Sequence, residues 1–162
     1  MRCLVNKSSL FIHFLVASLL LAACCPVNQD CNPRINRSEI GIGDQRIETM
    51  LWISRGWVEV NETVTIKYTI NNQSNQPIVF SRTDGPVVDI IVTPPDYVER
   101  NWSSVSEANV INTLELAPYE QKEFEWTFVA SLDGPYSVDG IIWFGRIADS
   151  VPNSFGAGAI GQ

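Results

Sequence analysis

Carboxylates are the side chains of this sequence best suited to acid–base chemistry. The sequence has 18 Asp and Glu residues but one histidine, His13. Glu123 and Glu125 alternate with Phe124 and Trp126, so both carboxylates fall on the solvent side of one predicted strand. A catalytic acid pair needs one buried member with a raised pKa, and the acidic residues do not follow the spacing of a calcium loop. We therefore expect a protein that is not an enzyme, with no catalytic residue, metal or cofactor.

The N-terminus carries the features of a secretory signal. A basic start precedes an apolar run over residues 10–21, which is shorter than a membrane-spanning helix needs. Leu21-Ala22-Ala23-Cys24 is similar to the lipobox of bacterial lipoproteins, in which the cysteine sulfur is acylated. We predict a lipoprotein signal peptide over residues 1–23 and lipidation of Cys24, with an ordinary signal peptide or an uncleaved signal anchor as alternatives. Cleavage would also remove His13 and exclude the histidine-based catalytic and zinc sites.

Two further cysteines would remain after cleavage. Cys25 and Cys31 are close enough in sequence to close a small loop beside the anchor. An exported protein reaches a compartment that permits disulfides. Cys25 and Cys31 are therefore a candidate disulfide, with two unpaired thiols or lipidation at Cys25 as the alternatives.

The charge balance bears on the partners. Removal of residues 1–23 would leave nine basic and 18 acidic residues, a net charge of about −9. Such a charge opposes binding to nucleic acid and to anionic lipid headgroups. The expected location is extracytoplasmic, with the protein held to a membrane of the bacterial cell envelope by its lipid.

The rest of the sequence is a series of short strand patterns. Residues 122–128 alternate strictly, with Phe124, Trp126 and Phe128 on one side, and residues 63–70 alternate in the same way around Tyr68. Three large aromatics on one strand face require a second layer to cover them. Turn residues separate the patterns at about the spacing of a sandwich. We predict an all-β fold, an immunoglobulin-like antiparallel β-sandwich of about seven strands, with a small closed barrel as the alternative.

The domain boundaries follow from where these patterns start and stop. Residues 24–45 show no sustained period and are predicted to be a flexible tether. Residues 46–148 hold the strand patterns and are predicted to be the domain. Residues 149–162 are rich in Gly, Ala and Ser and are predicted to be a flexible tail.

Three aromatic residues are candidate contacts with a protein partner: Tyr97, Trp102 and Tyr119. Each lies in or beside a predicted loop that is polar or carries proline, at residues 94–97, 103–109 and 118–121. Large aromatic side chains anchor many interfaces. Packing in the core is the alternative role for the tryptophan.

An ordered series of short motifs resembles a known family. In chain order the motifs are Asn72-x-Ser74 with Pro77-Ile78-Val79-Phe80, Asp89 before Ile90-Ile91-Val92, Trp102-Ser103, Leu114-x-Leu116-x-Pro118-x-Glu120, Phe124-x-Trp126 and Gly134-Pro135-Tyr136. Together they resemble the intracellular proteinase inhibitor (BsuPI) domain family over roughly residues 60–144. The family usually has Pro-Gly-Glu where this sequence has Pro118-Tyr119-Glu120. Tyr119 therefore requires a different turn or a left-handed backbone.

The resemblance implies an immunoglobulin-like sandwich that inhibits a serine protease by docking a loop or a strand edge. It supplies no reactive-site residues. The expected function is a lipid-anchored, extracytoplasmic protein-binding domain that resembles proteinase inhibitors. The alternative is a surface-binding or envelope-assembly module without inhibitory action. We expect a protein partner, and neither nucleic acid nor a small-molecule substrate.

Overall fold

The alternating segments of the sequence form strands with one buried side. The computed structural model describes residues 30–144 and 147–159. In β4 (Thr63–Asn72), four alternate side chains are buried as predicted: Val64, Ile66, Tyr68 and Ile70. In β9 (Gln121–Val129), the three aromatic side chains pack on the core, whereas Glu123 and Glu125 on the opposite side are exposed.

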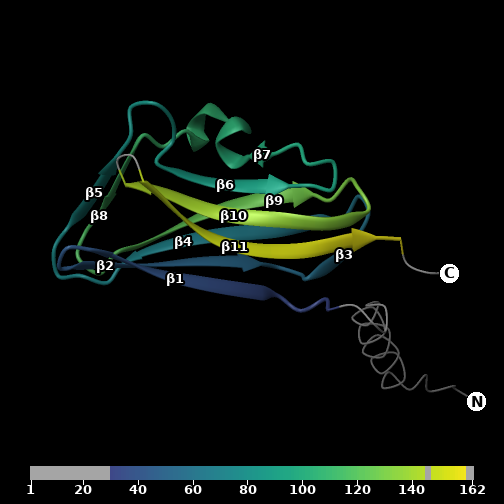
Figure 1. Ribbon diagram of the computed structural model, residues 1–162, viewed down its shortest axis with the longest axis horizontal. Coiled ribbons are helices and arrows are strands. Elements are labelled where there is room, and N and C mark those ends of the chain that lie inside the picture. Colours follow the sequence, from purple (N-terminus) through teal and green to yellow (C-terminus); the bar gives the residue numbers. More distant parts are fainter. Residues whose placement is uncertain (1–29, 145–146, 160–162) are drawn as a thin grey trace, which may run out of the picture.

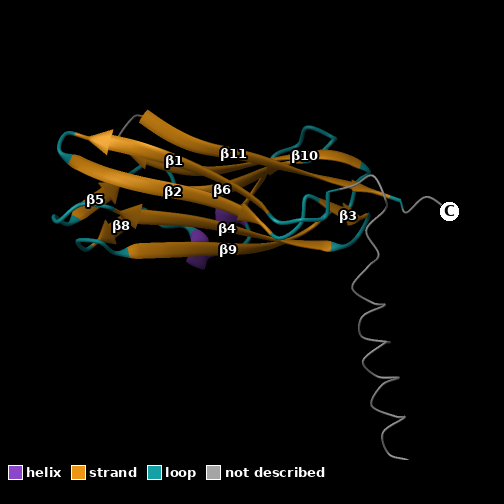
Figure 2. Cartoon of the chain, turned by 90° about the horizontal axis from the view of Figure 1, so that it is seen from below, coloured by secondary structure: helices purple, strands orange, loops and turns teal. Residues whose placement is uncertain are grey.

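Two sheets pack face to face (Figures 1 and 2). The first has the strand order β1 (Arg34–Ile42), β2 (Gln45–Ile53), β4, β9. The second has the order β3 (Trp57–Glu59), β11 (Ile147–Gly158), β10 (Gly134–Phe144), β6 (Val88–Thr93), β7 (Arg100–Asn101). A separate pair, β5 (Ile78–Ser81) and β8 (Thr113–Leu116), lies at one end of the molecule (Figure 1). The predicted all-β immunoglobulin-like sandwich is confirmed, with eleven strands in the described part rather than about seven.

Side chains from both sheets interlock in the core. The ring of Tyr68 in β4 lies so close to Gly140 in β10 that an added Cβ on Gly140 would be 2.4 Å from Tyr68 Cδ2. Nearby, the ring of Tyr136 stacks on Phe155 at 4.7 Å and meets Phe128 of the first sheet edge-on at 5.9 Å. The packing between sheets therefore depends on aromatic rings at fixed positions, without a disulfide in the interior of the described domain.

The predicted tether over residues 24–45 is wrong for residues 34–42, which form the edge strand β1. β1 pairs with β2 along all nine of its residues. Most of its side chains are exposed or half-buried, so the hydrophobic alternation that reveals a strand is weak there. The strand is also joined to the second sheet, because Asn36 Nδ2 donates to the carbonyl oxygen of Pro152.

The predicted flexible tail over residues 149–162 is wrong as far as Gly158, because β11 continues to that residue and pairs with β10. Its small residues reflect close packing against Trp57, whose indole would lie 3.0 Å from an added Cβ on Gly156 and 3.2 Å from one on Gly158. Pro152 is tolerated in β11 because β3 pairs only with residues 156–158 of that strand. The missing N–H of Pro152 therefore faces no strand that would accept a hydrogen bond from it.

Candidate functional site

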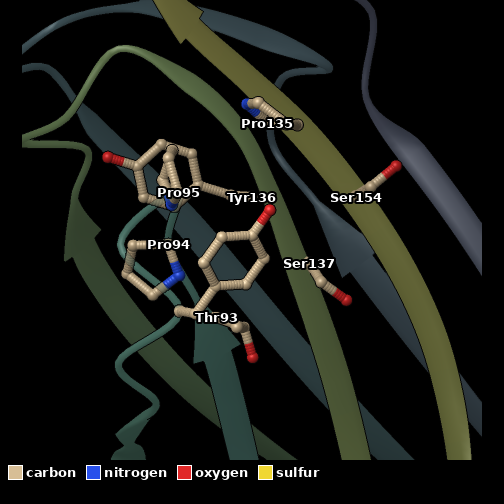
Figure 3. A pocket seen from close by; sticks show the side chains of 8 residues that line it. Thr93, Pro94, Pro95, Pro135, Tyr136, Ser137 and Ser154 are labelled. Atoms are coloured by element: carbon tan, nitrogen blue, oxygen red, sulfur yellow. The ribbon is translucent and has the colours of Figure 1, made fainter.

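A groove of about 300 Å³ lies at the start of β10, where the loop after β6 folds over the second sheet (Figure 3). Eight residues line it: Thr93, Pro94, Pro95, Tyr97, Pro135, Tyr136, Ser137 and Ser154. Figure 3 shows Pro94 and Pro95 on one side of the groove and Ser137 and Ser154 on the other. Three prolines and the rings of two tyrosines make the lining mainly apolar, and the hydroxyl groups of Thr93, Ser137 and Ser154 add sites for hydrogen bonds.

Tyr97 is held outward by a tight and strained turn. Its φ is 58°, in the left-handed region that costs a residue other than glycine about 1–2 kcal/mol. The backbone N–H of Tyr97 donates to the carbonyl oxygen of Pro94 at 2.9 Å, and Asp96 Oδ1 accepts from the N–H of Val98 at 3.1 Å. The Tyr97 side chain is 87% exposed, more than any other large hydrophobic side chain in the described part.

Four carboxylates lie close to the lining residues without lining the groove themselves: Asp96, Glu99, Asp133 and Asp139. Asp96 and Asp133 are near enough to Tyr136 to act on it electrostatically, and together with burial they raise the pKa of its hydroxyl. Asp139 follows Ser137 on the same side of β10. Burial raises the pKa of Asp139, and the charge of Glu99 adds to this effect. The groove therefore has a mainly apolar lining and acidic side chains close to it.

Tyr119 lies at the opposite end of the sandwich from this groove. Its N–H donates to Ser74 at 3.2 Å, beyond the end of β4 and just before the start of β9. Tyr97 lies by the start of β10, at the end where β4 begins and where Asn61 bonds to Ala130. The structure therefore does not bring these two predicted contacts together. Tyr119 has a φ of 58°, which confirms the left-handed alternative predicted for its turn.

The prediction that Trp102 contacts a partner is wrong, because its side chain is only 8% exposed. Its indole Nε1 donates to the carbonyl oxygen of Glu125 in β9 at 3.0 Å, and its ring meets Phe124 edge-on at 5.7 Å. The residue begins a short 3₁₀ helix, η1 (Trp102–Ser104), directly after β7. Trp102 thus has the core role considered as its alternative.

The buried carboxylate of Asp89 holds the segment around Trp102 in place, a role that the sequence did not predict. Asp89 in β6 is 4% exposed and accepts four hydrogen bonds. The donors are the N–H groups of Ile90 and Ser103, the Ser103 hydroxyl at 2.7 Å and the Asn101 amide at 3.3 Å. Its position inside an apolar strand was the available signal, because a charge in a buried run needs partners.

The predicted lipid and disulfide sites are only partly described. Cys31 is disulfide-bonded, whereas Cys25, its predicted partner, lies outside the described residues. Cys24 and the signal peptide over residues 1–23 also lie outside them, so lipidation and the Cys25–Cys31 pairing stay predictions. In the described part, no helix is long and apolar enough to cross a membrane. The same residues contain no group of three or more side chains arranged to hold a metal ion.

Comparison with known proteins gives only distant structural neighbours. No family model matches the chain, and no curated protein matches it. A beta-glucosidase from Listeria innocua, solved in complex with glucose, is similar with a TM-score of 0.46 and 12% identity over 74% of this chain, which spans 17% of that enzyme. The CARDB domain of PF1109 from Pyrococcus furiosus, solved with di-metal ions, has a TM-score of 0.42 and 12% identity over 80% of this chain and 97% of its own. The C-terminal domain of wzt has a TM-score of 0.40 and 10% identity over 82% of this chain and 77% of its own.

Proposed function

We propose that this chain is a lipid-anchored, extracytoplasmic protein-binding domain and that it binds its partner through the groove beside Tyr97. The observation that supports this proposal is the combination of strain and exposure at Tyr97. The residue occupies a left-handed backbone conformation while its side chain is 87% exposed. Packing in the core therefore does not offset the cost of that conformation.

Strain at an exposed aromatic residue favours a role in binding. Backbone outliers cluster at functional sites, where the surrounding structure maintains them. The third left-handed residue other than glycine, Asn61, needs no such explanation because asparagine tolerates this region. A tyrosine on a fixed turn gives a large contact area for the loss of little rotational freedom. Tyr97 has these properties, and an apolar groove lies beside it.

Inhibition of a serine protease is the second form of the proposal, favoured by the family resemblance and by the exposure of Asp96 and Tyr97. A loop that occupies a protease cleft like a substrate lies there as an extended strand. The hydrogen bond from Tyr97 to Pro94 closes residues 94–97 into a turn. This turn would have to open before such docking, so we favour binding without inhibition.

The test uses the purified full-length protein in detergent. Peptides are selected from a random displayed library, and their affinities are measured by fluorescence anisotropy for the unchanged protein, Tyr97→Ala and Tyr119→Ala. Tyr119 is a matched control, because it has the same φ of 58° and is also exposed, at 68%, but lies at the other end. We expect Tyr97→Ala to weaken binding about tenfold or more, as for an interface anchor, and Tyr119→Ala to change it less than about twofold.

Four results would each contradict a part of this proposal. Selection of no peptide, or equal loss of affinity in the two variants, would exclude the groove as the binding site. Failure to slow any member of a serine protease panel at micromolar protein would exclude the inhibitory form. The mass of the mature N-terminal peptide separately tests cleavage before Cys24 and its acylation, and an unmodified Cys24 would remove the lipid anchor from the proposal.

A further inference from the structure

We propose that the groove beside Tyr97 binds a basic peptide segment, with a Lys or Arg side chain over the Tyr97 ring and its charge facing the surrounding carboxylates. This inference rests on the proposed function and adds the chemical class of the partner. It depends on three features of the described residues: unpaired acidic charge, an exposed aromatic ring without a cation, and a groove with rigid sides.

The acidic charge around the groove is only partly neutralised. Asp96 forms an ion pair with Arg100 at 3.2 Å. Glu99, Asp133 and Asp139 have no basic partner among the described residues. These three carboxylates come from two different segments that meet at the groove, the loop after β6 and the start of β10. A cationic ligand would therefore meet complementary charge from both.

The cations near the groove are occupied within the domain. Arg34 Nη1 donates to the carbonyl oxygen of Ser154 at 3.0 Å and to its hydroxyl at 3.3 Å. The same side chain lies against Gly56, where an added Cβ would be 2.6 Å from Arg34 Nε. Arg34 is thus held at the β11 side of the groove, and Arg100 is held by Asp96. Neither contacts the carboxylates of Glu99 or Asp139 as an ion pair.

At Asp139, burial and the negative charge of Glu99 act together on one carboxyl group. Its carboxyl group is partly buried, and burial together with the charge of Glu99 raises its pKa, while a hydrogen bond with Ser137 acts in the opposite direction. A positive charge placed near both carboxylates would favour their ionised forms. Binding of a basic side chain would therefore relieve an unfavourable arrangement that exists in the free protein.

The Tyr97 ring is suited to hold the cationic side chain. A Lys or Arg group is attracted to the face of an aromatic ring within about 6 Å of its centre. The second sheet already has one such contact, since Arg82 Cζ lies 3.9 Å from the ring centre of Trp143 in β10. Trp143 belongs to the same alternating positions of β10 as Ser137 and Asp139, so this contact is on the groove's side of the sheet. Among the described residues, no cation lies over Tyr97.

The shape of the groove fits a peptide side chain with its flanking backbone. Pro94, Pro95 and Pro135 give it rigid apolar sides (Figure 3). The hydroxyls of Ser137 and Ser154 lie across from Pro94 and Pro95 and can bond to the backbone groups of an extended segment. A volume of about 300 Å³ is at the small end of ligand pockets. The occupant is therefore one or two side chains of a peptide rather than a folded domain.

The test measures binding of a fluorescein-labelled peptide of alternating Gly and Arg to the full-length protein by fluorescence anisotropy. Peptides of the same length with Gln or Glu in place of Arg serve as ligand controls. The variants are Tyr97→Ala, Glu99→Gln and Asp139→Asn. Glu115→Gln is the matched control, because Glu115 is also exposed and has no ion pair among the described residues but lies in β8, at the other end. Thermal unfolding of each variant checks that it is folded.

We expect the Arg peptide to bind at least about tenfold more tightly than the Gln peptide. Tyr97→Ala should remove most of this binding, Glu99→Gln and Asp139→Asn should each weaken it about two- to fivefold, and Glu115→Gln should leave it unchanged. Equal losses in Glu99→Gln and Glu115→Gln would mean general attraction to an acidic protein and would overturn the inference. Tyr97-dependent binding of neutral peptides without a preference for Arg would overturn it and leave the proposed function intact. Absence of Tyr97-dependent binding for every peptide would overturn both.

Discussion

Replacement of Gly140 by alanine tests the face-to-face packing on which the domain and its groove depend. The added Cβ would lie 2.4, 2.6 and 2.9 Å from Cδ2, Cε2 and Cγ of Tyr68, whereas carbon atoms in contact are about 3.5–4.0 Å apart. Tyr68 has no exposed surface, so its ring cannot move aside into solvent. The clash is resolved only by separation of the two sheets or by an unfavourable rotamer.

Overpacking of this kind costs about 1–3 kcal/mol, and three contacts with one immobile ring place Gly140→Ala at about 2–3 kcal/mol. For a domain of this size, each kcal/mol lowers the Tm by about 2–4 °C. We therefore expect the Tm to fall by about 5–10 °C, as measured by circular dichroism on the full-length protein. The control is Gly41→Ala, because Gly41 also lies in a strand but an added Cβ there meets no atom within 4 Å.

A double-mutant cycle identifies the contact responsible. In a Tyr68→Leu background the ring is absent, so Gly140→Ala should cost less than about 1 kcal/mol there. The coupling free energy between the two positions should then be about 1–2 kcal/mol. A Tm for Gly140→Ala within about 1 °C of the unchanged protein, or strictly additive effects in the cycle, would refute the packing of β10 on β4 described above.

Three further predictions concern buried and strained groups. Tyr68→Phe removes a buried hydroxyl that has Thr49 as a neighbour but no hydrogen bond of good geometry, so the free energy of unfolding should rise by up to about 1 kcal/mol in urea titrations. Burial raises the pKa of Tyr68 above its ordinary value of 10.0. The folded protein therefore keeps this proton where the unfolded chain loses it. The contribution to stability is complete below pH 10.0 and is lost above it, so the fall in stability above pH 10.0 should be shallower in Tyr68→Phe. Asp89→Ala leaves four donors without their acceptor and should cost about 2–4 kcal/mol in the same titrations, whereas Asp84→Ala, at an exposed ion pair, should cost much less. Tyr97→Gly relieves the left-handed strain and should leave the domain unchanged or up to about 1 kcal/mol more stable while it abolishes peptide binding, and a loss of more than about 1 kcal/mol would show that Tyr97 is structural.

The sequence predicted strands best where one face is buried and the other is solvated. β4 and β9 satisfy this condition, and their alternation identified the buried residues correctly. β1 is an edge strand with mostly exposed side chains, and β11 is built from small residues that fit against Trp57. In both cases the strand exists because a neighbouring strand offers hydrogen bonds and space. Neither condition leaves a periodic pattern in the segment itself.

The candidate contacts show the same division between local and non-local causes. The left-handed backbone of Tyr119 was one of two alternatives expected from the turn glycine of the family that the sequence resembles. The burial of Trp102 could not be predicted, because it depends on Asp89, thirteen positions earlier, and on the edge of β9. The acidic groove beside Tyr97 likewise needs the loop after β6 and the start of β10 to meet. Local sequence therefore determines the backbone conformation of a turn, whereas the pairing of strands determines which residues surround that turn.

The position of β1 also changes how the domain would sit on a membrane. The N–H of Gly56 donates to the carbonyl oxygen of Asn32 at 2.8 Å, so the chain joins the sandwich by that residue. If Cys24 is acylated, seven residues lie between it and Asn32, and eight peptide steps reach at most about 28 Å. The same end carries the groove, because Arg34 bonds to Ser154. A partner of the groove would then approach beside the membrane surface, whereas Tyr119 would face away from it, so the two tyrosines would meet different surroundings.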